Sequence, residues 1–383
     1  MTSEQNEAMH RGLMGIYFDR TNSSYIDGRE GKLLYRGFNI HDLAENSTFE
    51  EVVYLLLFGN LPTYRDLAQI ESDLKSNRVL PTEVLDIIGR AKSSSSMDVL
   101  RTAVSLLSSF DPDVGDNSPE ATRRKGLRIT AQAATIVAVH ERLRKGLQIV
   151  QPNPKLTHAG NFLYMLFGKI PSEEEAKILD LDFILHAEHG SNASTFAARV
   201  VASTRSDLHS ALVAAIGALK GPAHGGAAEG VMKMAEEIGT PDKAESYARD
   251  RLENRGWVTG FGHRVYKVED PRARHMKRRA QELGEKKGQP KWFQILTKLQ
   301  EVMEPYKRRG VHVNIDFFAG SVYHLLGIPS DLFISLFAMG RMPGWTLNVM
   351  EQLSNNILIR PLLEYTGPMD LDYIPLDARK ENN

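Results

Sequence analysis

The chain has 383 residues, of which 42% are hydrophobic and 25% charged, and its formal net charge is −1. This balance predicts a globular protein that can bury more than one core, without an overall field to attract nucleic acid or anionic lipid. Because the sequence contains no cysteine, disulfides, thiolate nucleophiles and zinc–sulfur sites are excluded.

The first residues predict a short β region after a polar start. Residues 1–7 are polar and acidic and have no apolar signal core, which together with the absence of cysteine favours a cytoplasmic protein. Residues 25–28 and 32–35 read as extended pieces on either side of a turn that contains Gly28 and Gly31. We expect a β hairpin here.

After the hairpin the pattern is helical nearly throughout. Residues 49–57 have a helical apolar face, with Ser47 or Thr48 as the N-cap and Gly59 as the stop. Further helices, several of them starting at Pro, Ser or Thr, are predicted at residues 63–78, 97–109, 126–145, 156–167 and 172–188.

The second half of the chain changes composition twice. Residues 191–219 are rich in alanine, which allows close helix packing and suits either a buried helix pair or a subunit interface. Residues 270–288 and 290–309 read as exposed amphipathic helices. We therefore expect a smaller polar lobe over 226–326, inserted into an apolar helical body.

The segment 221–226 reads Gly-Pro-Ala-His-Gly-Gly and places His224 in a glycine-rich turn. Glycine allows backbone conformations that could present the imidazole beside a helix N-terminus. There the neutral ring is favoured, and a neutral imidazole can donate a hydrogen bond to an oxyanion. The alternative is a histidine with a purely structural role in the loop.

His263 follows a second glycine-rich turn, Gly-Phe-Gly. The basic residues after it, Arg264, Lys267, Arg272 and Arg274, could hold a polyphosphate or carboxylates, or they could be an ordinary charged helix face. The sequence has no GxGxxG motif and no P-loop, so a dinucleotide or triphosphate site is not supported.

Asp316 lies in an apolar stretch, where loss of water would raise its pKa and make it a stronger base. A helix cap near Asn314 is the alternative. Arg341 and Arg360 also have apolar surroundings. Each requires a carboxylate, which either the protein or a ligand could supply.

His186 and His189 lie three residues apart and could share a metal ion, but the HExxH spacing and an obvious third ligand are missing. A metal-dependent hydrolase built on these residues with His224 and His263 is one alternative function. A catalytically inactive binding or interaction protein is another. An aspartate, two histidines in glycine-rich turns and several arginines suit removal of a proton beside a carbonyl while an anion is held.

Together these residues resemble the citrate synthase family, in the short form of archaea and many bacteria. The resemblance covers almost the whole chain, and its motifs lie at residues 26–28, 34–37, 54–63, 161–166, 188–194, 221–226, 262–267 and 270–272. It implies a mainly α, two-domain helical fold with a short N-terminal β hairpin region. The large domain would comprise 1–225 and 327–383, and the small domain 226–326.

The resemblance also implies an acyltransferase of the tricarboxylic acid cycle, which condenses acetyl-CoA with oxaloacetate and then hydrolyses the thioester to citrate and CoA. Asp316 would remove the acyl proton, His224 would stabilise the enolate, and His263 would protonate the ketone oxygen. Neither a metal nor a redox cofactor is implied. His189, Arg272 and Arg341 would bind the oxaloacetate carboxylates.

The family forms homodimers, and Arg360 matches the arginine that reaches into the partner's site. The implied CoA contacts are Val258, Thr259, Gly260, Phe261, Gly262 and Lys267.

Several positions depart from the family pattern. Gly340 stands where serine is usual, His312 where proline is common and Phe318 where tyrosine is common. Met342-Pro343 and Leu362-Leu363 are further departures. They bear on the preferred acyl size and on the strength of CoA phosphate binding. A 2-methylcitrate synthase, which uses propionyl-CoA, therefore stays open.

Overall fold

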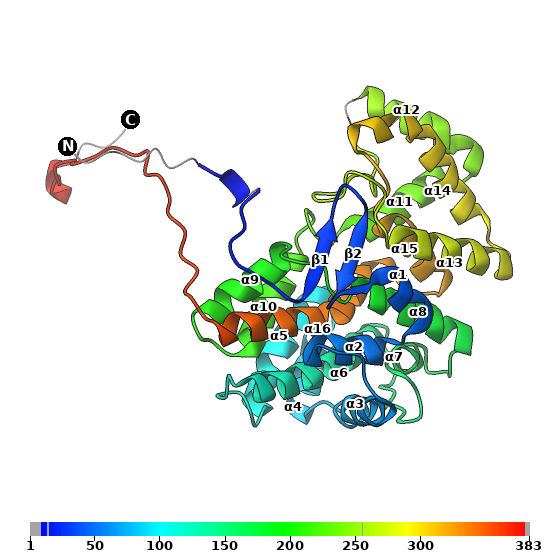
Figure 1. The fold of residues 1–383 in the computed structure, drawn as a ribbon. Coiled ribbons are helices and arrows are strands. Elements are labelled where there is room, and N and C mark those ends of the chain that lie inside the picture. Colours follow the sequence, from blue (N-terminus) through cyan, green and yellow to red (C-terminus); the bar gives the residue numbers. More distant parts are fainter. Residues whose placement is uncertain (1–8, 14, 255, 380–383) are drawn as a thin grey trace.

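The structure is a computed structural model that describes residues 9–13, 15–254 and 256–379, and the polar segment 1–7 lies outside them. Helices predominate and the strands form one small sheet, which confirms the predicted mainly α fold with a short N-terminal β region (Figure 1). None of the helices in the described part has both the length and the apolar character of a membrane span.

The N-terminal sheet is antiparallel, with strands in the order β1 (Ser24–Asp27), β2 (Lys32–Tyr35) and β3 (Phe38–Asn39). The first two strands are the predicted hairpin. β3 was not predicted, because two residues are too few to give an alternating pattern.

The hairpin turn packs closely on the segment that follows His263. A Cβ atom on Gly28 would lie 2.2 Å from the Val265 carbonyl oxygen, so the contact requires glycine. The Gly28 carbonyl accepts a hydrogen bond from the Lys267 N–H at 2.7 Å. The N-terminal sheet thus supports a loop of the candidate site.

The larger group of helices surrounds α16 (Phe333–Ser354), which passes through the middle of this group in Figure 1. The other members are α1 (Ile40–Asn46), α2 (Phe49–Phe58), α3 (Tyr64–Ser76), α4 (Thr82–Arg90), α5 (Ser96–Leu107), α6 (Pro119–Arg144), α7 (His158–Phe167), α8 (Glu173–His186), α9 (Ala193–Ser203) and α10 (Leu208–Leu219). α16 packs against α6, α8, α9 and α10, so it forms the centre of the core.

Local capping explains the helix starts that were predicted correctly. Thr48 caps α2 and forms a reciprocal capping box with Glu51, while Gly59 ends the helix in the left-handed conformation at φ 93°. Ser172 and Glu175 form the same box at the start of α8.

Two predicted boundaries were wrong. α6 begins at Pro119 rather than near residue 126, because its charged first turns hide the apolar period that marks a helix. The helix predicted over 290–309 divides into α14 (Lys291–Val302) and a 3₁₀ segment over Glu304–Arg309. Pro305 follows this break and lacks the N–H that a continuing helix requires.

The alanine-rich stretch is a close helix pair, α9 and α10. Ala198, Ala202, Ala211 and Ala215 are buried, so this face forms the buried pair, one of the two alternatives that the sequence left open. Other small residues of α10, such as Ala214, are only half-buried, so part of its surface is left uncovered within one chain.

A second group of helices gathers at the upper right of Figure 1. It contains α11 (Ala227–Ile238), α12 (Ala244–Glu253), α13 (Ala273–Lys286), α14 and α15 (Asp316–Leu325). α13 packs on α14 and α15, α12 on α14, and α11 on α15. These helices cover the residues predicted as the polar lobe.

The chain after α16 leaves the body as an extended segment, residues 355–379, which we call the C-terminal arm (Figure 1). It has no helix apart from a 3₁₀ turn over Leu376–Ala378. Large apolar side chains are exposed along it, from 54% for Ile374 to 95% for Leu363.

Candidate active site

His224 lies in the tight loop between α10 and α11. The Gly221 carbonyl accepts hydrogen bonds from the N–H groups of His224, at 2.9 Å, and Gly225, at 3.2 Å. A Cβ atom on Gly225 would lie 2.4 Å from the Leu219 carbonyl oxygen, so only glycine allows the loop to fold back on α10. The imidazole is thereby fixed three residues before α11.

Hydrogen bonds and burial together define the state of the His224 ring. Its Nε2 lies 2.9 Å from Oγ of Ser194, which also accepts a hydrogen bond from Trp345 Nε1 at 3.2 Å. The serine hydroxyl donates its own hydrogen to the side-chain oxygen Oδ1 of Asn192 at 2.7 Å. Burial, together with the positive charge of Arg341, lowers the pKa of His224 to about 4. The ring is therefore neutral at pH 7.

The tautomer of His263 is set by the backbone. Its Nδ1 accepts hydrogen bonds from the N–H groups of Val265, at 3.0 Å, and Tyr266, at 3.1 Å. Burial, helped by the charge of Arg272, lowers the pKa of His263 to about 4. The neutral ring consequently carries its hydrogen on Nε2 and can donate it to a ligand.

His189 lies beside His263, with ring centroids 5.3 Å apart. Its Nε2 is 3.0 Å from the hydroxyl of Tyr266, and only 7% of the residue is exposed. Burial lowers the pKa of His189 well below its usual value, and the charges of Arg272 and Arg341 add to this effect. The structure thus brings two neutral imidazoles together.

Arg272 is buried and largely committed to Asp270. Its Nε and Nη2 donate to the two carboxylate oxygens at 2.9 and 2.7 Å, and this charge pair holds the pKa of Asp270 below its usual range although burial raises it. The remaining Nη1 has a 3.5 Å contact with the Leu185 carbonyl oxygen. Arg272 therefore offers a ligand one edge, rather than a whole guanidinium.

Arg341 differs, because much of its guanidinium has no acceptor. The residue is 1% exposed, its Nε donates to the His186 carbonyl, and Nη1 and Nη2 are buried without a partner in the described part of the chain. Burial lowers its pKa to about 10, so the group stays positive at pH 7. A buried cation with two free donors is suited to bind a carboxylate.

Glu188 attracts Arg341 but is held elsewhere. Its carboxylate accepts hydrogen bonds from Ser24, Gly190 and Asn348 at 3.1, 2.6 and 3.0 Å. Burial raises the pKa of Glu188 to about 7. The carboxylate thus leaves the two outer nitrogens of Arg341 available to a ligand.

Asp316 is the first residue of α15 and is half-buried. Burial raises its pKa, while the charges of His186 and Arg272 oppose the increase. The alternative of a helix cap is not supported, because α15 starts without a side-chain capping hydrogen bond and Asn314 donates instead to the Gly262 carbonyl at 3.2 Å.

The turn predicted to contact CoA is joined to the loop before Asp316. Gly262 N–H donates to the His312 carbonyl at 2.7 Å, and Asn314 N–H donates to the Gly260 carbonyl at 3.0 Å. Gly260 has φ +88°, and a Cβ atom there would lie 2.6 Å from the Phe317 ring. The glycine turn and the start of α15 are therefore one structural unit.

The remaining predicted contacts are distributed as follows. Val258 and Phe261 are buried, whereas Lys267 is exposed beside the turn. Thr259 packs under α11, where its methyl carbon limits the space at Gly230. Arg360 is exposed on the C-terminal arm, and a single chain does not bring it to the other site residues.

The sequence reasoning assigned no role to Ser194, Tyr266 or Phe337. Ser194 and Tyr266 contact site histidines directly, and the Phe337 ring lies 4.8 Å from the ring of His186 and 4.8 Å from the guanidinium carbon of Arg341. Ser194 and Tyr266 lie within the motifs around His189 and His263, which was the available signal. Phe337 lies in an apolar run that looks like ordinary core.

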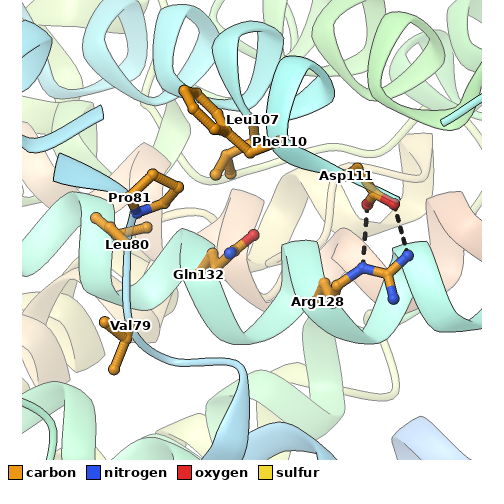
Figure 2. A pocket seen from close by; sticks show the side chains of 8 residues that line it. All are labelled: Val79, Leu80, Pro81, Leu107, Phe110, Asp111, Arg128 and Gln132. Atoms are coloured by element: carbon orange, nitrogen blue, oxygen red, sulfur yellow. Dashed lines mark hydrogen bonds and ion pairs between the residues drawn. The ribbon is translucent and has the colours of Figure 1, made fainter. Parts of the chain in front are cut away.

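A separate pocket of about 290 Å³ contains none of these residues (Figure 2). Its only cation, Arg128, is paired with Asp111 at 2.6 Å, so the pocket offers no free positive charge. It is lined by Val79, Leu80, Pro81, Leu107, Phe110, Asp111, Arg128 and Gln132.

In the described residues, no group of three or more His, Asp or Glu side chains is placed to hold a metal ion, so the hydrolase hypothesis lacks its ligand cluster.

Fold and site define a mainly helical enzyme with a buried arginine that can bind an anion, neutral imidazoles and a desolvated carboxylate. The family model of the citrate synthase C-terminal domain matches residues 12–362. A citrate synthase of Deinococcus radiodurans is 44% identical, covering 97% of this chain and 99% of its own. The chain belongs to the citrate synthase family and is an enzyme of that type.

Two further proteins are similar to this chain over almost its whole length. The 2-methylcitrate synthase 2 of Corynebacterium glutamicum is 41% identical, covering 99% of this chain and all of its own. The second is a solved citrate synthase of Thermoplasma acidophilum, in a ternary complex with carboxymethyl coenzyme A and oxaloacetate. It is 32% identical in sequence and has a TM-score of 0.93, and the match covers 97% of this chain and 100% of its own.

Proposed function

We propose that this enzyme condenses acetyl-CoA with oxaloacetate and hydrolyses the product thioester to citrate and CoA. The observation that carries the proposal is the buried guanidinium of Arg341, with two nitrogens that lack an acceptor in the described part of the chain. A dicarboxylate substrate supplies that acceptor. His224 and Asp316 both interact electrostatically with the same guanidinium.

The reaction begins at the methyl group of the acyl-CoA. The Asp316 carboxylate takes a methyl proton, and the electron pair of the broken C–H bond moves toward the thioester oxygen. In this step the Ser194 hydroxyl turns its hydrogen from Asn192 Oδ1 to Nε2 of His224, and the neutral ring then carries its own hydrogen on Nδ1. This N–H stabilises the developing enolate oxygen.

The enolate carbon then attacks the ketone carbon of oxaloacetate. The ketone oxygen receives the Nε2 hydrogen of His263, while the oxaloacetate carboxylates bind Arg341, Arg272 and His189. Water subsequently attacks the thioester carbon and gives a proton to Nε2 of His263, which regains its hydrogen. The C–S bond breaks, and the proton held by Asp316 goes to the sulfur, so CoA leaves as the thiol. Each step uses acid, base and hydrogen-bond chemistry, so no metal or redox cofactor is required.

The CoA moiety is assigned to the turn of Val258, Thr259, Gly260, Phe261 and Gly262, with Lys267 near the phosphates. Support comes from the joining of this turn to the loop before Asp316, because a ligand on the turn would contact the unit that carries the base. We assign the enzyme to the cytoplasm, because CoA thioesters are made inside the cell.

The two groups of helices are assigned as domains: 1–225 with 327–383, and 226–326. α11 to α15 pack mainly on one another, and the proposed substrate contacts come from both groups. A closing movement of the smaller domain would exclude water from the enolate and complete the site.

The active form is assigned as a homodimer in which Arg360 reaches the partner's site. The C-terminal arm exposes a row of apolar side chains, and surface of this kind is usually covered by another polypeptide. Half-buried small residues on α10 provide a second surface for close packing. A single chain leaves Arg360 away from the site.

A 2-methylcitrate synthase activity with propionyl-CoA is the second candidate, favoured by the Corynebacterium glutamicum relative. The two donors differ by one methylene, which a pocket discriminates by only about 1–3 kcal/mol.

The test is release of CoA thiol, followed with a thiol dye, from each donor with oxaloacetate. We expect the higher kcat/KM with acetyl-CoA and citrate as the product by mass spectrometry. A clear preference for propionyl-CoA would overturn the assigned donor, and no release with either donor would favour an inactive CoA-binding protein.

A further inference from the structure

Asp182 is a fully buried carboxylate that links two helices of the site. Its Oδ1 accepts a hydrogen bond from the hydroxyl of Tyr323, on α15, at 2.6 Å. The same oxygen lies 3.2 Å from Nδ1 of His186, and this nitrogen also lies 2.9 Å from the Asp182 carbonyl oxygen. One side chain of α8 thus contacts the end of its own helix and the helix that begins with Asp316.

Stability alone does not explain this carboxylate. A buried carboxylate is costly unless all its hydrogen bonds are made, and Oδ2 of Asp182 has no partner in the described residues. Its neighbours along α8, Leu181 and Phe183, are buried apolar residues. An acid at this position is better explained by its orienting Tyr323 and His186 at the site.

Tyr323 lies on the same face of α15 as Asp316. The two residues are seven positions apart, which is close to two helical turns. Tyr323 is 1% exposed, so water does not compete for its hydroxyl. Its bond to Asp182 therefore fixes the Asp316 face of α15 relative to α8.

His186 connects this network to both halves of the proposed reaction. Two acceptors surround its Nδ1, so Nδ1 carries a hydrogen, while Nε2 is buried without a partner in the described residues. Its carbonyl accepts a hydrogen bond from Nε of Arg341. Among the charged groups around Asp316, His186 has the largest effect in lowering its pKa.

We propose that Asp182 and Tyr323 are positioning residues, which hold His186 and the first turn of α15 in the mutual orientation that proton removal by Asp316 requires. This inference rests on the proposed function of Asp316 as the base. In this proposal, neither Asp182 nor Tyr323 contacts the substrate. Each acts through a neighbour, Asp182 through His186 and Tyr323 through its helix.

The pH profile separates positioning from simple structural support. The charged or titratable groups that act on Asp316 or respond to it are His186, Asp182, Arg272, Asp270, Tyr323 and Arg341. The charge of Asp182 raises the pKa of Asp316, so Asp182→Asn should lower that pKa and move the acid limb of kcat to lower pH. Tyr323→Phe keeps that charge, so its acid limb should stay in place.

The experiment compares Tyr323→Phe and Asp182→Asn with Tyr247→Phe, which removes an exposed 2.8 Å bond to Glu237 within the same group of helices. We expect Tyr323→Phe to lower kcat roughly 10- to 100-fold, to leave the oxaloacetate KM within about twofold, and to speed amide hydrogen exchange over residues 316–325. Tyr247→Phe should change none of these.

An unchanged kcat and unchanged exchange in Tyr323→Phe would overturn the inference. So would equal losses in kcat with unshifted pH profiles in both variants, because that is the result of structural support alone. If the unsubstituted enzyme releases no CoA, the proposed function fails, and the exchange measurement still decides whether Tyr323 holds α15.

Discussion

At the scale of single residues, the site keeps its imidazoles neutral and surrounds them with fixed hydrogen-bond partners. Burial lowers the pKa values of His224 and His263 to about 4, far below the pH of the cell. A neutral imidazole can donate a hydrogen bond to an oxyanion that forms during the reaction. Arg341 supplies a positive charge whose two outer nitrogens have no acceptor in the described part of the chain, so it can bind an anion.

Replacement of the proposed base should abolish turnover without unfolding the protein. Asp316 makes no helix-capping hydrogen bond, so Asp316→Ala should keep the fold and lower kcat by roughly 10²–10⁴-fold. Thiol release measures turnover, and circular dichroism checks the fold. Turnover within threefold of the unsubstituted enzyme would reject Asp316 as the base.

Removal of the anion-binding guanidinium should act on oxaloacetate rather than on CoA. We expect Arg341→Leu to raise the oxaloacetate KM about 10- to 100-fold, since a charged hydrogen bond contributes about 1.5–3 kcal/mol. Steady-state kinetics with each substrate varied in turn measure this. Arg249→Leu, in an exposed pair with Glu245, is the matched control, and an unchanged oxaloacetate KM in Arg341→Leu would contradict the assignment.

At the scale of elements, the sequence predicted helices well where local signals mark their ends. Thr48, Glu51 and Gly59 define α2 through contacts within the helix and its caps. The start of α6 was missed although Ser118 caps it and Pro119 is its first residue, because its charged first turns hide the apolar period. Motifs located His224, but its contact with Ser194 joins residues from different elements and leaves no local pattern.

The contact between α2 and α8 carries a cost that depends on pH. Burial together with repulsion from Glu50 raises the pKa of Asp180. Burial also raises the pKa of Glu50, and repulsion from Glu71 adds to this effect. Because these folded-state pKa values lie above the unfolded ones, the folded state binds more protons in between, and stability falls as pH rises through that window.

Asp180→Asn should therefore stabilise the protein by roughly 1 kcal/mol at pH 8 and by less at pH 5. Its amide oxygen can still accept the hydrogen bond from the Phe49 N–H, now at 3.1 Å. Urea unfolding at both pH values measures the effect, with exposed Asp86→Asn as the control. Equal or negative changes at the two pH values would contradict this account of the pair.

At the scale of the whole molecule, the exposed C-terminal arm is the feature that one chain does not explain. It carries Arg360 and a row of apolar side chains away from the body. The family resemblance pointed to this arginine, whereas no local sequence pattern could indicate that its site lies on another chain. The proposed dimer gives both features one explanation.

Mixing two inactive variants tests this arrangement. Asp316→Ala and Arg360→Leu homodimers should each have little activity, because every site lacks one group. After subunit exchange at equal ratio, about half the dimers are mixed, and each has one complete site, which restores about a quarter of normal turnover. If Arg360 acted within its own chain, mixing would restore nothing.

The most direct measurement for the whole account is a crystal structure with oxaloacetate and carboxymethyl coenzyme A. The account predicts an oxaloacetate carboxylate on the free nitrogens of Arg341, its ketone oxygen within about 3.2 Å of Nε2 of His263, and the acyl end of the analogue between Asp316 and His224. Oxaloacetate bound away from Arg341, or an acyl end that does not reach Asp316, would contradict it.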